Sequence, residues 1–414
     1  MTEVQATAGQ QEDGHPVDAV RSESSALAGY WVSSRLVMLA LVATGRLEPA
    51  VEVEQRYQHW YEGFLTGSFP IGDVAWQYPP GAALVMLGPG LLRPLGYLAG
   101  FVVLSLAADA AVVVALRRAG RRPGRSTAGA WLWALGLPLL LDLPYIRYDV
   151  LVTTVAVAAL LAQRRRPGLG GALAGLGAMV KVWPLLTVLG TPRGRSTRQA
   201  WLSLAASAAV LAVVLATVFR GAFGFLTAQH HRGVEIESLG GSGLQVARLL
   251  GWPGRVQGRF GSLEFEGPHV SWVAGLSLLL SCAAFGWLLL WRVRARRWTA
   301  ATPYDAALAA VLLFTVTSRV VSPQYLVWLV GLTAVCLTVR ETSQRPVAVL
   351  LLLATAMTTA DYPLYFWRMI DGDGAAAAVI VVRNALLAAA AVVSCVRLWH
   401  ASAGRPRDLG ATPC

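Results

Sequence analysis

The chain has 414 residues, of which 55% are hydrophobic and only 14% are charged, and its mean hydropathy is +0.53. Soluble domains carry about 25% charged residues, so this composition excludes an ordinary soluble fold. The net charge of +12 comes from arginines in short stretches between apolar runs, a pattern typical of membrane proteins rather than of nucleic-acid-binding surfaces. We therefore predict an all-α, polytopic transmembrane helical bundle that has membrane lipids, and no nucleic acid, as partners.

The two ends of the chain are polar. Residues 1–27 lack the charged, apolar and cleavage regions of a signal peptide, so we expect a disordered cytoplasmic tail. Residues 28–399 should form the transmembrane domain, and residues 400–414 a second cytoplasmic tail. Three of the four cysteines lie in apolar segments and show no disulfide or metal-ligand spacing. The sequence thus predicts one membrane domain that needs no metal or other cofactor.

Ten apolar runs have about the length that a helix needs to cross the hydrocarbon core of a bilayer. Arginine clusters lie between them, and the positive-inside rule places these clusters and both termini in the cytoplasm. This orientation predicts a multi-pass protein of the plasma membrane. The predicted spans are residues 28–46, 97–116, 127–144, 149–163, 199–219, 271–292, 303–318, 324–339, 346–360 and 376–397.

Two further apolar stretches, 81–95 and 168–192, are interrupted near their centres. A single crossing by 168–192 would put one of its two flanking arginine clusters on the wrong side, and Lys181-Val182-Trp183-Pro184 interrupts this run. We expect two broken or re-entrant hairpins, which gives about 10–12 membrane helices. Irregular backbone is tolerated at membrane depth only where protein or a watery cavity covers it, so the break at Lys181 predicts a site.

Lys181 is the only lysine beside 34 arginines. One interpretation is that its ammonium binds a lipid phosphate, because an intramembrane cation needs a partner. The other is a side chain that extends from a helix end to the interface without a function. Asp109 and Arg383 also lie inside predicted spans, and we expect them to form structural ion pairs, either with each other or with another membrane charge.

Two long outer loops, 46–80 and 220–270, hold many of the acids and histidines. In the first loop Glu52, Glu54 and Asp73 are candidate general bases among interfacial aromatics. In the second, His231 lies beside Arg232 and two acids, a set that suits a hydroxyl-rich or phosphorylated ligand better than a metal ion. Simple solvation of these side chains, and membrane anchoring by the aromatics, are the alternatives.

Five short motifs follow one another along the chain: Trp76-Gln77-Tyr78-Pro79-Pro80 after Asp73, Arg147-Tyr148-Asp149, Gly175 to Pro184, Arg232-Gly233 with Glu237-Ser238, and Ser322-Pro323-Gln324-Tyr325. Taken together in this order, they resemble the GT-C type glycosyltransferases that use polyprenyl-phosphate sugars, in particular the family 87 mannosyltransferases of actinobacteria. In the family an aspartate usually precedes the tyrosine-tryptophan pattern of the first loop, where this chain has Glu52 and Glu54.

The resemblance implies an inverting α-mannosyltransferase. Its polyprenyl-phosphate donor and its glycolipid, lipoglycan or glycoprotein acceptor would meet on the outer face of the cell envelope. One acid, Glu52, Glu54 or Asp73, would act as base, with His231 as a further catalytic candidate. The residues that would bind substrate are Lys181, Arg232, Arg147, Arg319, Tyr78, Glu237 and Gln324.

Two other classes of protein share some of these features. A secondary transporter or lipid flippase also has broken helices and buried charges, but it tends to place its binding charges at the membrane midplane. A non-catalytic partner subunit of an envelope enzyme is the third possibility. Intact acids at the mouth of an outward-facing cavity would argue for the enzyme.

Overall fold

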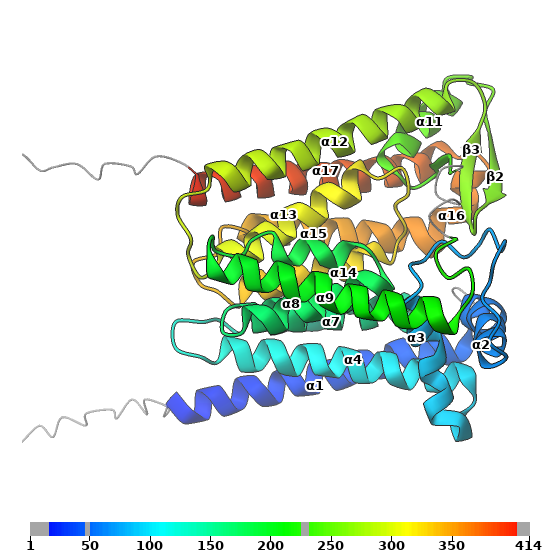
Figure 1. Cartoon of the computed structure of the whole chain (residues 1–414). Helices are drawn as coiled ribbons and strands as arrows, with labels where there is room; N and C mark the ends of the chain where they lie inside the picture. The colour runs from blue at the N-terminus through cyan, green and yellow to red at the C-terminus, as the bar shows by residue number, and fades with distance from the viewer. Residues whose placement is uncertain (1–15, 46–49, 225–231, 404–414) are drawn as a thin grey trace, which may run out of the picture.

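The computed structural model describes residues 16–45, 50–224 and 232–403, and most of these residues lie in helices that run side by side (Figure 1). Within these ranges six helices are long and apolar enough to cross a membrane. They are α1 (Pro16–Thr44), α4 (Tyr97–Gly120), α9 (Arg195–Val218), α12 (Val270–Arg294), α15 (Arg345–Thr359) with its continuation, and α17 (Gly374–Ser402). The chain is therefore a polytopic membrane helical bundle, as predicted.

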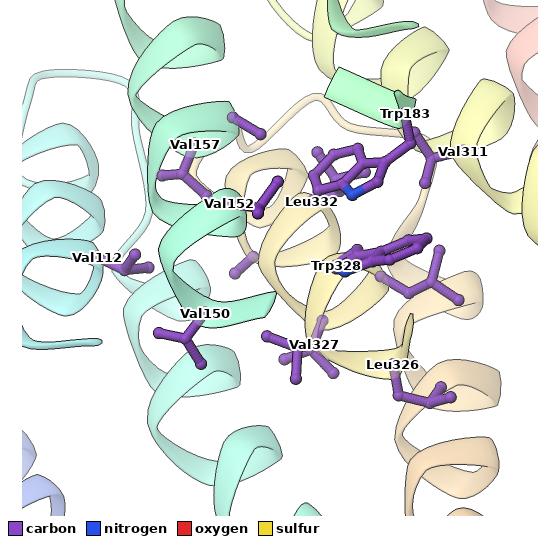
Figure 2. Packing of buried hydrophobic residues seen from close by; sticks show 14 of the residues in the cluster. Val112, Val150, Val152, Val157, Trp183, Val311, Leu326, Val327, Trp328 and Leu332 are labelled. Carbon is purple, nitrogen blue, oxygen red and sulfur yellow. The ribbon is translucent and has the colours of Figure 1, made fainter. Parts of the chain in front are cut away.

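Shorter apolar helices fill the centre of the bundle. These are α5 (Ala128–Gly136), α7 (Asp149–Gln163), α8 (Pro167–Val180), α13 (Thr302–Thr317) and α14 (Tyr325–Leu337). Helix α14 is buried on every side because its residues are apolar all round. Its Trp328 ring stacks on Trp183 with 5.2 Å between centroids, among valine and leucine side chains (Figure 2).

Helices α8 and α9 approach each other closely because small residues lie between them. A Cβ atom on Gly171 would lie 2.0 Å from the carbonyl oxygen of Ala200, so only glycine fits there. Helix α8 also packs on α7, which fixes the end of α8 against the centre of the bundle.

The predicted break in the 168–192 stretch is confirmed. Helix α8 ends at Val180, the backbone of Lys181 is extended (φ −154°, ψ 132°), and a 3₁₀ helix, η4 (Trp183–Val188), follows. Because η4 packs on both α8 and α13, the two pieces form a hairpin whose tip is Lys181. Fourteen residues at about 1.5 Å each put this tip about 20 Å from the start of α8.

The 81–95 stretch is also irregular, as predicted. A short helix, α3 (Ala82–Leu87), passes into η2 (Gly88–Leu95), which contains a kink at Leu92. The predicted span 127–144, in contrast, is not one helix. It divides into α5, η3 (Leu137–Leu140) and α6 (Leu143–Ile146), and Pro138 and Pro144 lie at the starts of the two later pieces, where the proline ring is tolerated.

The two predicted outer loops are largely ordered structure at one end of the bundle. The first contains a π-helical turn, η1 (Glu52–Tyr57), and α2 (Gln58–Leu65). The second contains α11 (Leu239–Leu249) and an antiparallel sheet of β1 (Val234–Glu235), β2 (Arg255–Arg259) and β3 (Ser262–Glu266) in the order β1-β3-β2. Helix α15 reaches the same end through η6 (Ala360–Tyr365) and α16 (Phe366–Ile370).

Figure 1 shows the sheet, α2 and α16 at one end of the bundle, whereas α1 begins and α17 ends at the opposite end. The start of α1 and the end of α17 therefore lie on the same side of the bundle. Helix α1 begins at Pro16, well before the predicted boundary at residue 28.

Candidate active site

A cavity of about 960 Å³ lies at the end of the bundle that carries the sheet. The first outer segment, the tip of the α8–η4 hairpin, the β2–β3 turn, the α13–α14 connection and η6 all contribute to its wall. Six lining side chains are cationic (Arg56, Arg147, Lys181, Arg232, Arg259, Arg319) and three are carboxylates (Glu52, Glu235, Glu237). The excess of cations favours an anionic ligand.

Lys181 lies on the inner wall, where three segments meet. Its Nζ atom donates to Oδ1 of Asp149 at 2.6 Å, and the Trp328 indole N–H donates to the same oxygen at 2.6 Å. The rings of Tyr148, Tyr325 and Trp328 surround the ammonium at 4.7–5.2 Å from Nζ. The 12% of the Lys181 side chain that remains exposed faces the cavity. This lysine is thus held in place, and does not extend to the interface.

The three predicted arginines line the same cavity. Arg232 pairs with Glu264 (3.3 Å) and bonds Ser262, and Arg319 donates to the backbone oxygen of Arg232. Arg147 differs, because its side chain donates to the adjacent backbone oxygen of Ile146 and forms no ion pair with an acid among the described residues. Its guanidinium is therefore a cation with free capacity for an anion.

The structure separates the three candidate acids of the first outer loop. Glu52 lines the cavity, and both its carboxylate oxygens accept from Nη1 of Arg56, at 2.9 and 2.7 Å. Glu54 is exposed and is not part of the cavity wall, because residues two apart in a helical turn point in nearly opposite directions. Asp73 accepts from the Trp60 indole (2.8 Å) and the Ala75 backbone, so it fixes the loop.

A backbone contact joins this outer loop to the Lys181 hairpin. The N–H of Gly81 donates to the carbonyl oxygen of Met179 at 2.8 Å, just before the break. A Cβ atom on residue 81 would lie 2.5 Å from that oxygen, which is why glycine is needed here. The position of the outer loop is therefore fixed relative to the hairpin tip.

Tyr78 and Gln324 also line the cavity. The Tyr78 ring packs edge-on against Tyr148, with 5.2 Å between centroids, and so joins the outer loop to the aromatic rings around Lys181. Gln324 directly precedes α14. His231 lies outside the described residues, so its predicted role stays a prediction.

The second outer segment adds a buried cluster at the wall. Glu237 pairs with Arg383 of α17 at 3.3 Å, and Arg383 also lies 3.6 Å from Asp361. The pairing of Arg383 with Asp109, one of the partners expected from the sequence, is therefore wrong. Asp109 instead binds Arg35 of α1 at 2.8 Å, so Asp109 does have the expected structural role.

Glu235 is a lining acid that sequence reasoning did not select. Its two oxygens accept from the backbone N–H groups of Glu237 (3.1 Å) and Val321 (3.2 Å), and it is 3% exposed. Burial raises the pKa of Glu235 to about 8, against the effect of these two hydrogen bonds and of Arg383. Burial, together with the neighbouring carboxylate of Glu235, likewise raises the pKa of Glu237. Burial therefore favours the protonated forms of the two carboxyl groups on this side of the cavity.

Asp149 and the rings of Tyr325 and Trp328 were also missed as site residues. Their signal was present in the sequence, because Asp149 and Tyr325 belong to motifs of the predicted site. The described residues contain no cluster of three or more histidines, cysteines or acids that could hold a metal ion. The chemistry of the wall is that of cations, carboxyl groups and aromatic rings.

This arrangement can bind an anion at Lys181 and Arg147 while a carboxylate, Glu52, lies on the same cavity wall. The model of glycosyltransferase family 87 matches residues 76–323, more than half of the chain. The matched region includes every predicted substrate-binding residue except Gln324, which lies one position beyond it, and it does not include Glu52, Glu54 or Asp73. No curated protein and no solved structure matches the chain.

Proposed function

Since the chain belongs to glycosyltransferase family 87, we propose that it transfers a sugar from a polyprenyl-phosphate donor to a glycolipid, lipoglycan or glycoprotein of the cell envelope. We propose mannose as the sugar because the sequence motifs resemble those of family 87 mannosyltransferases. The reaction would invert the anomeric carbon and form an α-mannoside. Glycosyl transfer itself follows from the family, whereas donor, sugar and acceptor are parts of the proposal.

The choice of a phosphate-linked donor rests on Arg147. It is a lining guanidinium without an acidic partner among the described residues, and it lies two residues from Asp149, the acid that holds Lys181. A phosphate would supply the missing countercharge through a bidentate pair of hydrogen bonds. Lys181 lies about 20 Å from the start of α8, a depth that suits a phosphate on a membrane-embedded chain better than a water-soluble nucleotide.

Glu52 is the proposed base. The acceptor oxygen would attack the anomeric carbon while the bond from that carbon to the phosphate oxygen breaks. The acceptor proton would pass to Glu52, and the bonding electrons would leave with the phosphate, where Lys181 and Arg147 stabilise the charge that develops. Glu52 suits this role because, among the acids in the described part of the first outer loop, it is the one that lines the cavity.

The outer face of the plasma membrane is the proposed location of the site. Arginines follow α4, precede α9 and follow α12, and these helix ends lie on the side of the bundle where α1 begins and α17 ends (Figure 1). The positive-inside rule makes that side cytoplasmic. The cavity is at the other end, where lipid-linked sugars are available and nucleotide sugars are not.

The test of the donor uses the purified protein in liposomes with labelled mannose, linked either to polyprenyl phosphate or to a nucleoside diphosphate. We expect transfer only from the lipid donor, and a higher KM for that donor in Arg147→Met. Arg255→Met is the matched control, since Arg255 is exposed, pairs with Glu266 and does not line the cavity.

Transfer from the nucleotide donor alone, or equal kinetics in the two arginine variants, would contradict the proposal. Transfer of a different polyprenyl-linked sugar would keep the donor class and replace mannose. Movement of the labelled lipid across the bilayer without any transfer would favour a flippase.

A further inference from the structure

Asp149 is the first residue of α7 and lies directly behind the cavity wall. Its side chain is 1% exposed, and it is not one of the residues that line the cavity. The oxygen Oδ1 accepts two short hydrogen bonds, one from Lys181 Nζ and one from the Trp328 indole, both at 2.6 Å. Asp149 therefore does not touch a ligand, but it touches the ammonium that does.

The need for such a partner follows from the chemistry of lysine. An ammonium is a point charge on a flexible four-carbon chain, with no preferred geometry toward a phosphate. At Lys181 the helix has just ended and the backbone is extended, so the main chain does little to direct this side chain. A fixed carboxylate supplies one hydrogen-bond direction and a countercharge.

Trp328 provides the reason that Asp149 is itself fixed. The indole N–H holds Oδ1 from α14, and the same indole ring stacks on Trp183 and Tyr325, with 5.2 and 3.9 Å between centroids. The chain of contacts runs from a rigid aromatic stack, through Asp149, to the ammonium. A group held in this way is preorganised for charge that develops in a transition state.

We infer that Asp149 is a positioning residue for the transferase reaction. It directs the free N–H groups of Lys181 at the phosphate of the donor, with Trp328 as the anchor. This inference rests on the proposed function, because the phosphate ligand is part of that proposal. The simpler alternative is that the pair only closes the contact between α7, the α8–η4 hairpin and α14.

A double-mutant cycle separates positioning from folding, since groups that act through one another lose their effects together. The probe is a labelled polyprenyl phosphate without sugar, bound at equilibrium to the purified protein in detergent. We expect Asp149→Asn to weaken binding by about tenfold or more, as Lys181→Met does. In the Lys181→Met background, Asp149→Asn should have no further effect. Asp149→Glu, which restores the charge, should recover part of the affinity.

The matched control is Asp305→Asn. Asp305 is also a buried aspartate in the first turn of a helix, α13, and its carboxylate accepts from Thr342 and Ser343 of another segment. It does not line the cavity, so binding should stay at the wild-type level. The midpoint of thermal unfolding, measured for every variant, shows whether a loss of binding comes from a loss of fold.

Wild-type affinity in Asp149→Asn, or independent losses in the double variant, would overturn the inference. Absence of binding to the wild type would overturn it as well. If the binding cycle behaves as expected but mannose is not transferred, the inference holds and the proposed sugar fails. The two results are therefore distinguishable.

Discussion

Replacing Glu235 with glutamine should change how the stability of the protein depends on pH. Glu235 lies in β1 and is 3% exposed. The charged groups that act on it are Glu237, Arg383 and Arg232, and two backbone N–H groups donate to its oxygens. Burial outweighs these interactions and raises its pKa from 4.5 to about 8.

The sign of the effect follows from proton binding. Between pH 4.5 and about 8 the folded protein keeps a proton on Glu235 that the unfolded chain has released, so the free energy of unfolding falls as the pH rises. One proton corresponds to about 1.4 kcal/mol per pH unit, or about 5 kcal/mol across this window. Glutamine carries no such proton. In Glu235→Gln the free energy of unfolding should therefore fall less steeply with pH, by the contribution of about one proton. Compared with the wild type, the variant should be more stable at pH 8 than at pH 5.

The assay is thermal unfolding of the purified protein in detergent from pH 5 to pH 8. The control is Glu266→Gln on the edge of the same sheet, where a hydrogen bond from Arg255 lowers the pKa of the carboxyl group. The Glu266–Arg255 pair stabilises the fold at any pH above the pKa that Glu266 has in the unfolded chain, and this stability is lost only as the pH falls toward its lower pKa in the folded protein. The Glu266→Gln control should therefore shift Tm by the same amount at every pH from 5 to 8. Parallel plots of Tm against pH for the wild type and Glu235→Gln would refute the reasoning.

Three further substitutions test other parts of the structure. Asp109→Asn leaves the buried Arg35 without a countercharge and should lower the free energy of unfolding by about 3–5 kcal/mol; an unchanged Tm would contradict this. Gly81→Ala places a Cβ atom 2.5 Å from the oxygen of Met179 and should reduce transfer by about a hundredfold while the protein stays folded; wild-type kinetics would show that the loop contact does not matter. Asp73→Asn should keep most of the transfer activity, because this acid fixes its own loop; near-complete loss would mean that it reacts with substrate.

The bundle was predictable because membrane-spanning helices need long apolar runs, and arginine clusters mark their ends. The same clusters revealed the broken hairpin at Lys181, since one crossing would have violated the charge rule. The outer sheet was not predictable in this way. Its strands β2 and β3 are each five residues long and contain both charged and apolar side chains, and antiparallel pairing with each other stabilises them.

The partners of the charged residues depend on tertiary structure that the sequence does not display. Arg383 binds Glu237, which is 146 positions away, whereas Asp109 binds Arg35 in the first helix. The choice between Glu52 and Glu54 likewise depends on which side of one helical turn faces the cavity. Most residues of the sequence motifs therefore lie at one cavity, and the rotation of single turns decides which of their side chains line it.

The most direct test of the account is transfer of labelled mannose from polyprenyl-phosphate mannose by the wild type, Glu52→Gln and Glu54→Gln at equal levels of protein. Glu52 lines the cavity and pairs with Arg56, whereas Glu54, two residues later, is exposed, so each variant removes one acid of the same helical turn but only Glu52→Gln changes the cavity wall. The account predicts that transfer disappears in Glu52→Gln and persists in Glu54→Gln. Transfer that survives in Glu52→Gln, or that is lost equally in both, would contradict it.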